Sequence, residues 1–279
     1  MIHSRGTVER TFVVFGGGGV KGMTHAGAWR AITESGIEVS ELIGTSIGAL
    51  VATSISGGRD WKQLYDQARA LRKPDIVALN RWTLLLNGIR QSSIFLDAPL
   101  RRYIELSLPT EQYSDLRIPV SINAVDLETG ETVWFGAAGR TDVSLHDAVY
   151  ASCALPLFYP PAEIGGEYYV DGGVNDALPI RLAAERGATT IIAIDASAGP
   201  VRDSEDTVAN GLVAIHHRVT EIMGYARKRA LLEAWSGPRL LYVRPNLDAY
   251  STFDFGKTEY FLEEGYRATK AALQAAAVV

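Results

Sequence analysis

One stretch, residues 41–51, constrains the fold of this chain more than any other. It reads Glu-Leu-Ile-Gly-Thr-Ser-Ile-Gly-Ala-Leu-Val, so an apolar pair runs into a Gly-x-Ser-x-Gly pattern and then into small and apolar residues with helical spacing. We interpret it as a strand, a sharp turn and a helix, with Ser46 at the apex. A serine at such a corner sits in a strained backbone, so its neighbours Gly44 and Gly48 must have almost no side chain.

Ser46, at the N-terminus of the expected helix, is a candidate nucleophile, with Thr45 and Ile47 completing the turn. Unpaired backbone N–H groups and the helix dipole favour negative charge there, and negative charge develops during acyl transfer. As a lone pattern, Gly-x-Ser-x-Gly also fits a plain helix start bounded by glycine. The choice therefore depends on the other segments.

The composition fits one large α/β domain or two small ones, because 279 residues with 47% hydrophobic and 21% charged side chains can bury a substantial core. The net charge is −5 and no basic block is present, which argues against a nucleic-acid partner. A single cysteine, Cys153, excludes an internal disulfide and a cysteine-based zinc site. We find no calcium-loop spacing and expect neither a metal nor a cofactor.

The first ten residues have no apolar core of signal-peptide length, and no apolar run approaches the roughly 20 residues that span a bilayer. We therefore expect a cytoplasmic protein that contacts a membrane, if at all, from its surface. The oligomeric state has no signal in the sequence.

A glycine-rich loop, residues 16–22, follows an expected buried strand at 11–15 and precedes an expected helix at 23–35. Its Gly-x-Gly-x-x-Gly spacing satisfies the dinucleotide fingerprint, which also needs an acidic residue about 20 positions on, at the end of a second strand. Glu38 and Glu41 lie near that distance, but the second strand ends in the Ser46 turn. Nucleotide binding is therefore disfavoured.

The alternative function for this loop is an oxyanion hole. Exposed N–H groups, chiefly those near Gly18 and Gly19, would face Ser46 and bind a developing negative charge. A purely structural glycine turn also fits this loop.

Asp171 is a second candidate active-site residue. It follows an expected strand at 167–170 and precedes Gly172 and Gly173. The glycines let the backbone bend sharply and place the carboxylate at a strand end, where active-site groups of open α/β sheets collect. Asp176 is a weaker candidate, because it lacks adjacent glycines and is expected to cap a helix that begins with Pro179.

Strands alternate with helices along most of the chain, which predicts one layered α/β domain. We divide it into an N-terminal extension (1–10), a catalytic region (11–200) and a helix-strand-helix region (201–279) packed on the same domain. Residues 81–96 fit a packing segment, or alternatively a flap over the active site. The remaining expected segments are helices at 46–56, 60–71, 93–106, 145–152, 179–186, 207–235 and 257–276, strands at 118–126, 131–135, 190–195 and 240–244, and a polar loop at 199–206.

Together these residues resemble the patatin-like phospholipase family over about residues 11–195. The family motifs occur in order: the Gly-Gly-Gly-Val-Lys-Gly of residues 17–22, the Gly-Thr-Ser-Ile-Gly of 44–48 and the Asp-Gly-Gly of 171–173. Residues 151–156 also resemble its Ala-Ser-x-Ala-x-Pro block. One departure is Gly16, where the family often has Asp.

The resemblance implies a three-layer α/β/α fold with a mostly parallel central sheet and helices on both faces. It also implies a lipid acyl hydrolase in which Ser46 is the nucleophile, Asp171 is the general base, and Gly17, Gly18 and Gly19 form the oxyanion hole. A carboxylate can accept the serine proton directly if desolvation raises its pKa. Lys21 and Gly22 would support the loop. Lys21 could attract a phosphate head group, but we favour a surface lysine, because lysine side chains are usually exposed.

No histidine is an obvious third member of this site. We expect structural or surface roles for all five: His3, His25, His146, His216 and His217.

Two alternatives remain open at this stage. An acyltransferase would use the same serine, although malonyl-type transferases place His where this chain has Thr45. A ligand- or assembly-regulated effector, or a non-catalytic lipid-binding protein of the same fold, would keep these motifs without constitutive turnover.

Overall fold

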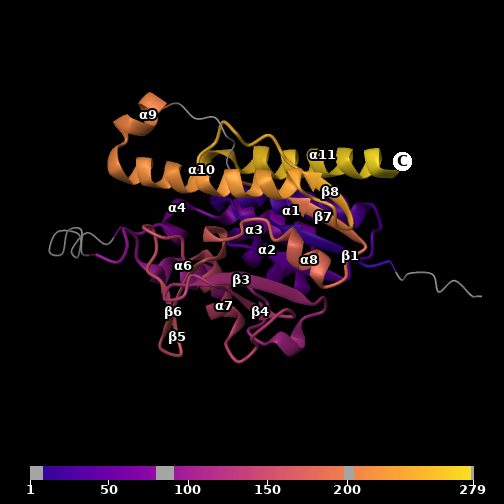
Figure 1. Ribbon diagram of the computed structural model, residues 1–279, viewed down its shortest axis with the longest axis horizontal. Helices are drawn as coiled ribbons and strands as arrows, with labels where there is room; N and C mark the ends of the chain where they lie inside the picture. Colours follow the sequence, from indigo (N-terminus) through magenta and orange to yellow (C-terminus); the bar gives the residue numbers. More distant parts are fainter. Residues whose placement is uncertain (1–8, 80–90, 198–203, 278–279) are drawn as a thin grey trace, which may run out of the picture.

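The computed structural model describes residues 9–79, 91–197 and 204–277. Within these ranges eight strands form one sheet in the order β5-β6-β3-β2-β1-β7-β8, with β4 paired to β3 (Figure 1). The strands are β1 (Thr11–Phe15), β2 (Glu41–Gly44), β3 (Val120–Asp126), β4 (Thr132–Gly136), β5 (Ala162–Ile164), β6 (Glu167–Asp171), β7 (Thr190–Ile194) and β8 (Arg239–Val243). From β3 to β8 along this order every pairing is parallel, whereas β4, β5 and β6 pair antiparallel.

Helices cover both faces of the sheet (Figure 1). The α-helices are α1 (Thr24–Glu34), α2 (Ile47–Ser56), α3 (Trp61–Ala70), α4 (Lys73–Ile76), α6 (Asp97–Ser107), α7 (Leu145–Cys153), α8 (Ile180–Glu185), α9 (Ser204–Ala209), α10 (Gly211–Glu233) and α11 (Thr258–Ala277). Short 3-10 turns are η1 (Gly19–Met23), η3 (Tyr113–Asp115), η4 (Gly172–Val174) and η5 (Phe255–Lys257).

The strand β1 shows how the two faces arise, because successive side chains of a strand point to opposite sides. Val13 and Phe15 pack in the larger core with α1, α2, α7 and α11, whereas Phe12 and Val14 pack in the smaller core with α8 and the C-terminal end of α10. All four side chains are fully buried. The structure thus confirms the predicted three-layer α/β/α fold with a mostly parallel central sheet.

The strand β3 explains how two distant segments meet. Its residues Ser121–Val125 pair with β4, which fills one edge of β3. The other edge is shared: β2 pairs with Val120–Ile122, and β6 pairs antiparallel with Ala124–Asp126. Since β2 and β6 run toward each other along this edge, the end of β2 at Gly44 and the end of β6 at Asp171 face each other.

Some local predictions need correction. The polar loop expected at 199–206 gives way to α9 from Ser204, and the single helix expected at 207–235 is divided between α9 and α10 by Asn210 and Gly211. Gly211 has φ +78, a conformation that interrupts a helix. The helix expected from Ser93 begins at Asp97, because the residues before it form an extended bridge between Leu79 and Phe95.

One α-helix and one strand had no prediction. The helix α4 occupies the segment around Pro74, with the proline in its first turn. The strand β5 lies directly after the proline-rich connection at residues 156–161 and is stabilised by pairing with β6. Such a short edge strand depends on its partner more than on its own sequence.

The flap suggested at 81–96 lies mainly outside the described residues. Its described end is held by backbone hydrogen bonds from Ile94 to Leu157 and from Phe95 to Phe158. Across the described parts of the chain, no helix combines the length and apolarity needed to span a membrane.

Candidate active site

The turn at Ser46 has the strained geometry that the sequence predicts. Ser46 has φ 55 and ψ −126, a left-handed conformation that is unusual for any residue with a side chain. A Cβ atom on Gly48 would lie 2.1 Å from the Phe15 carbonyl oxygen, and one on Gly44 would lie 2.5 Å from the Ala49 Cα. The turn can therefore form only because both positions are glycine.

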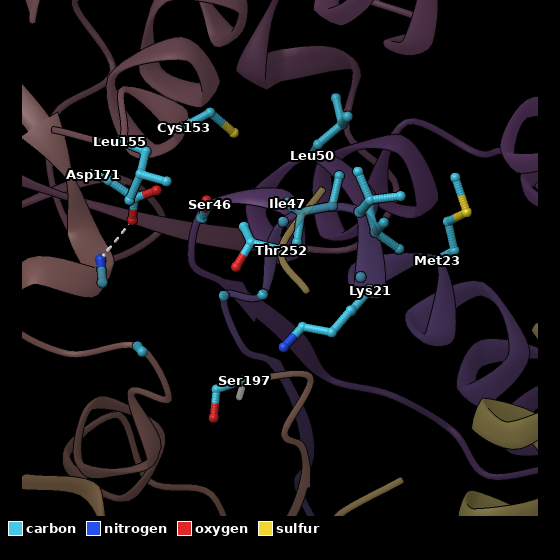
Figure 2. Close-up of a pocket in the computed structure, with 18 of the residues that line it drawn as sticks. Lys21, Met23, Ser46, Ile47, Leu50, Cys153, Leu155, Asp171, Ser197 and Thr252 are labelled. Carbon is cyan, nitrogen blue, oxygen red and sulfur yellow. Dashed lines mark hydrogen bonds between the residues drawn. The ribbon is translucent and has the colours of Figure 1, made fainter. Parts of the chain in front are cut away.

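Asp171 ends β6 and is 3% exposed. Its Oδ1 accepts a hydrogen bond of 2.7 Å from the Gly173 N–H, drawn as a dashed line in Figure 2. Burial raises the pKa of Asp171 to about 6, although its interactions with the Ser46 hydroxyl and the Gly173 amide act in the opposite direction. The carboxyl is therefore poised to take up and release a proton near neutral pH.

The segments before Ser46 and after Asp171 are tied together. The Asp176 carbonyl accepts hydrogen bonds from the Asn123 side-chain amide at 2.9 Å and from the Thr45 hydroxyl at 3.3 Å. A Cβ on Gly172 would collide with the Asn123 Oδ1 at 2.3 Å, so this glycine permits the close approach. These contacts fix the position of one turn of the site relative to the other.

Asp176 itself does not line the pocket that Asp171 lines. Its Oδ1 accepts a hydrogen bond from the Leu178 N–H, and the residue preceding α8 is Pro179. Asp176 thus braces the turn before α8 and is not the helix cap that we predicted, because the chain makes a further turn before the helix begins.

The glycine loop lies against Ser46 through Gly17, whose Cβ position is 3.6 Å from the Ser46 Cβ. The Gly17 N–H already donates to the Ala177 carbonyl at 2.9 Å, whereas no acceptor within the described ranges is assigned to the amides of Gly18 and Gly19. A Cβ on Gly18 would lie 2.4 Å from the Ala196 carbonyl oxygen, and Gly19 has φ +60. Of the three predicted donors, Gly18 and Gly19 thus have amides available to a ligand.

Lys21 corrects our preference for a surface lysine. It lies in η1, lines the pocket and is only 1% exposed (Figure 2). The neighbouring Gly22 packs on the turn, because a Cβ there would lie 2.3 Å from the Ile47 Cγ2. Pattern reasoning placed Lys21 outside because lysine is usually exposed, but the loop folds inward between Ser46 and α1.

The structure has no acidic residue at the end of β2, where dinucleotide binding requires one. Glu41 begins β2 and does not end it, and its carboxylate accepts hydrogen bonds from Ser121 and Arg186. The carboxylate is 2% exposed and thus serves an internal ion pair. Glu38 precedes the strand.

The pocket has a volume of about 220 Å³. Ser46, Asp171 and the glycine loop line it, and Figure 2 shows Ser46 with Asp171 and Cys153 beside it. Apolar side chains from α2, α3 and α6 extend the pocket away from Ser46; they include Leu50, Val51, Leu64, Ala68 and Leu100. The inner face of α10 also contributes. The arrangement suits a ligand with a polar reacting group and an apolar chain.

Sequence reasoning missed several residues around Ser46. The Ser152 hydroxyl accepts a 2.8 Å hydrogen bond from the Ser46 N–H. Cys153 is buried beside Ser46 and Asp171, and burial raises its thiol pKa well above the usual value. The Ala-Ser-x-Ala-x-Pro block contains both residues and was the available signal for them.

Thr252 had no sequence signal. Its carbonyl accepts a 2.9 Å hydrogen bond from the Val20 N–H, and its hydroxyl contacts the His217 Nε2 at 3.0 Å. Thr252 therefore links the glycine loop to α10. His217, which belongs to α10, lines the pocket.

His25 is a buried structural histidine, as predicted, and its Nε2 is hydrogen-bonded to the Gly16 carbonyl. Burial lowers the pKa of His25 to about 4.

The described residues contain no group of three or more His, Cys, Asp or Glu side chains able to hold a metal ion.

The sequence profile of the Patatin-like phospholipase family matches residues 13–184, which include Ser46, Asp171 and the glycine loop. The chain belongs to the patatin-like phospholipase family. The resemblance inferred from the motifs is thereby confirmed.

Several relatives are similar to this chain over most of its length. An uncharacterized NTE family protein of Mycobacterium tuberculosis is 32% identical over 228 residues, which cover 80% of this chain and 60% of the relative. Lysophospholipase NTE1 of Saccharomyces cerevisiae is 29% identical over 276 residues, or 91% of this chain and 16% of the yeast protein. The chain therefore spans only part of the length of these relatives.

Solved structures support the patatin-like fold. VipD from Legionella pneumophila aligns with a TM-score of 0.60 and 17% identity, over 96% of this chain and 67% of VipD. The type III effector protein ExoU aligns with a TM-score of 0.50 and 14% identity, over 96% of this chain and 53% of ExoU.

Proposed function

We propose that this protein is a serine lipid acyl hydrolase that cleaves carboxylic esters of phospholipids, lysophospholipids or neutral lipids. The observation that carries the proposal is the meeting of a strained serine and a buried carboxyl with a raised pKa in one largely apolar pocket. Membership of the patatin-like phospholipase family and the similarity to a yeast lysophospholipase support it. We propose residues 11–200 as the catalytic region, with 201–279 packed on it.

The proposed mechanism uses these residues in two steps. Asp171 accepts the proton of the Ser46 hydroxyl as the oxygen attacks the ester carbonyl. The amides of Gly18 and Gly19 stabilise the oxyanion, and the alcohol leaves with the proton from Asp171, so an acyl-Ser46 ester remains. Water, deprotonated by Asp171, then attacks this ester, and the fatty acid is released as the Ser46 oxygen leaves and takes the proton back from Asp171. The two turns are shaped by the residues around the reacting atoms, which are Gly44, Thr45, Ile47, Gly48, Gly172 and Gly173.

The apolar extension of the pocket would hold the acyl chain. Leu50 and Val51 come from α2, directly after Ser46, so a chain bound beside them has its carbonyl end near the serine. Lys21, buried in the same pocket, would attract an anionic head group. A lipid is therefore the substrate that the pocket fits best.

The test is direct product analysis. The protein is incubated with lysophosphatidylcholine and with phosphatidylcholine, in the presence and absence of an acceptor alcohol, and products are identified by mass spectrometry. We expect free fatty acid in both conditions and labelling of Ser46 by a fluorophosphonate probe. Acyl transfer to the alcohol without fatty acid release would indicate the transferase alternative, and absence of both turnover and labelling would indicate a binding protein.

The pH dependence tests the role of Asp171. A general base must be deprotonated, and burial raises the pKa of Asp171 to about 6. We therefore expect kcat/KM for an uncharged soluble ester to fall about tenfold per pH unit below this value and to level off above about pH 7. A pH series in a constant-ionic-strength buffer measures it. An acidic limb centred near pH 4, the usual carboxyl range, would contradict the role of a buried base.

A further inference from the structure

The helix α10 has an exposed apolar face that the proposed chemistry does not use. Exposed apolar side chains recur at intervals of three and four residues, which places them on one side of a helix. We call them the outer stripe: Leu212, Ile215, Val219, Ile222 and Met223, with exposed fractions of 79%, 40%, 49%, 50% and 55%. A contiguous apolar surface of this kind on a soluble domain marks an interaction site.

The opposite side of the same helix lines the pocket. His217, Thr220, Glu221 and Gly224 belong to the pocket wall, and with about 100° of rotation per residue they face away from the outer stripe. Figure 1 shows α10 at the outside of the fold, with α9 at its N-terminal end. The stripe is thus separated from the candidate active site by the thickness of one helix.

The two ends of α10 are held differently. Toward its C-terminal end, Leu231 and Leu232 pack against the smaller core, and the Lys228 ammonium contacts Asp195 and Ser197 in a buried ion pair. Burial alone would raise the pKa of Asp195, but Lys228 and the hydrogen bonds to it hold that pKa at about 2. The stripe precedes this anchor, so it is presented on a helix whose orientation is determined by the core.

The charge on α10 indicates the kind of partner. Within residues 211–233 there are four Arg or Lys and two Glu, whereas the whole chain carries a net charge of −5. Glu221 is only 13% exposed and contacts Arg218, and Glu233 lies near Arg229. Arg227 is exposed beside the end of the stripe. Since Lys228 is paired with Asp195, three of the four cations have a neighbouring carboxylate, and Arg227 supplies the positive charge beside the stripe. An apolar stripe beside an exposed arginine matches the surface of an anionic bilayer, in which apolar side chains enter the interface and a cation approaches the phosphates.

We propose that the outer stripe of α10 docks on an anionic lipid surface and so holds the pocket at the membrane. This inference rests on the proposed function, because a bilayer supplies the lipid that the pocket would receive. Docking leaves the inner face of α10 and its contact between His217 and Thr252 in place, since these groups lie on the other side of the helix.

The decisive experiment measures binding without turnover. The full chain carrying Ser46→Ala is sedimented with vesicles of phosphatidylcholine alone or of phosphatidylcholine with phosphatidylglycerol. We expect partitioning onto the anionic vesicles to be about fivefold stronger, because one exposed arginine contributes about 1 kcal/mol, and to weaken with added salt. The double change Val219→Glu and Ile222→Glu should lower it by at least about tenfold, because it places two charges in the membrane interface.

A matched control is the double change Leu106→Glu and Leu127→Glu, which alters two leucines outside α10 that are 66% and 56% exposed. It adds the same two charges elsewhere and should leave partitioning within about twofold. Equal binding by the double variant and its parent would overturn the proposal. So would an absence of vesicle binding by the parent, or a stable dimer in light scattering that the double variant abolishes, which would assign the stripe to a second copy of the chain.

A second readout separates this proposal from the proposed function. With Ser46 intact, the double variant should lose at least about tenfold in kcat/KM on vesicle lipid but keep its activity on a soluble short-chain ester. Vesicle binding without hydrolysis of either substrate would refute the hydrolase alone. Hydrolysis of the soluble ester by a protein that does not bind vesicles would refute the docking surface alone.

Discussion

Replacing Ser46 with alanine is expected to reduce ester hydrolysis by about 10⁴-fold or more, because removal of a nucleophile leaves only substrate binding and oxyanion stabilisation. The same change should abolish fluorophosphonate labelling. Both effects are measured on purified protein with a soluble ester and with lysophosphatidylcholine. The fold should persist, since the backbone conformation at this position is supported by Gly44 and Gly48.

Ser54 provides a matched control for that variant. It also lines the pocket, but its hydroxyl donates to the Leu50 carbonyl within α2 at 2.8 Å and has no role in the proposed chemistry. Ser54→Ala should therefore stay within roughly threefold of the wild-type kcat/KM. Substantial turnover in Ser46→Ala would refute an acyl-Ser46 intermediate.

Replacing Asp171 with asparagine is the second large change. We expect a loss of about 10²–10⁴-fold in kcat/KM, the usual contribution of a general base, and disappearance of the acidic limb near pH 6. Asparagine keeps the size of the side chain and an Oδ1 that can accept the Gly173 N–H. The loss is therefore attributable to the proton acceptor. Asp176→Asn is the control, because its Oδ1 can still accept the Leu178 N–H and it lies outside the pocket.

The free energy of unfolding shows whether the Asp171→Asn variant is folded. The pKa of Asp171 is about 6 in the folded protein and about 4 in an unfolded chain, so the folded state binds the proton more tightly. This group thus favours the folded state below about pH 4, and that contribution disappears as the pH rises to about 6. At pH 8 the free energy of unfolding of Asp171→Asn should equal or exceed that of the wild type, by up to about 3 kcal/mol. Urea titration measures it.

Short-range patterns predicted much of this protein. The alternation of apolar runs and helical segments predicted the layered α/β fold, and the glycines around Ser46 predicted its strained turn, because both depend on neighbouring residues along the chain. Errors arose where distant contacts dominate. Lys21 is buried by a loop that folds inward, β5 exists through its pairing with β6, and α9 is separate from α10 because of the break at Asn210 and Gly211.

The amino-acid sequence by itself determined the proposed reactive groups and their local geometry, since the glycines beside Ser46 and Asp171 permit the turn that each of them needs. The tertiary structure alone decided that these groups meet. Two strands, β2 and β6, approach from opposite directions along one edge of β3, and the antiparallel pairing of β6 brings Asp171 to the end of β2. No local pattern encodes that meeting, because it depends on hydrogen bonds from β3 to two strands that lie more than a hundred residues apart in the chain. The tertiary packing likewise decided that the apolar stripe of α10 faces outward.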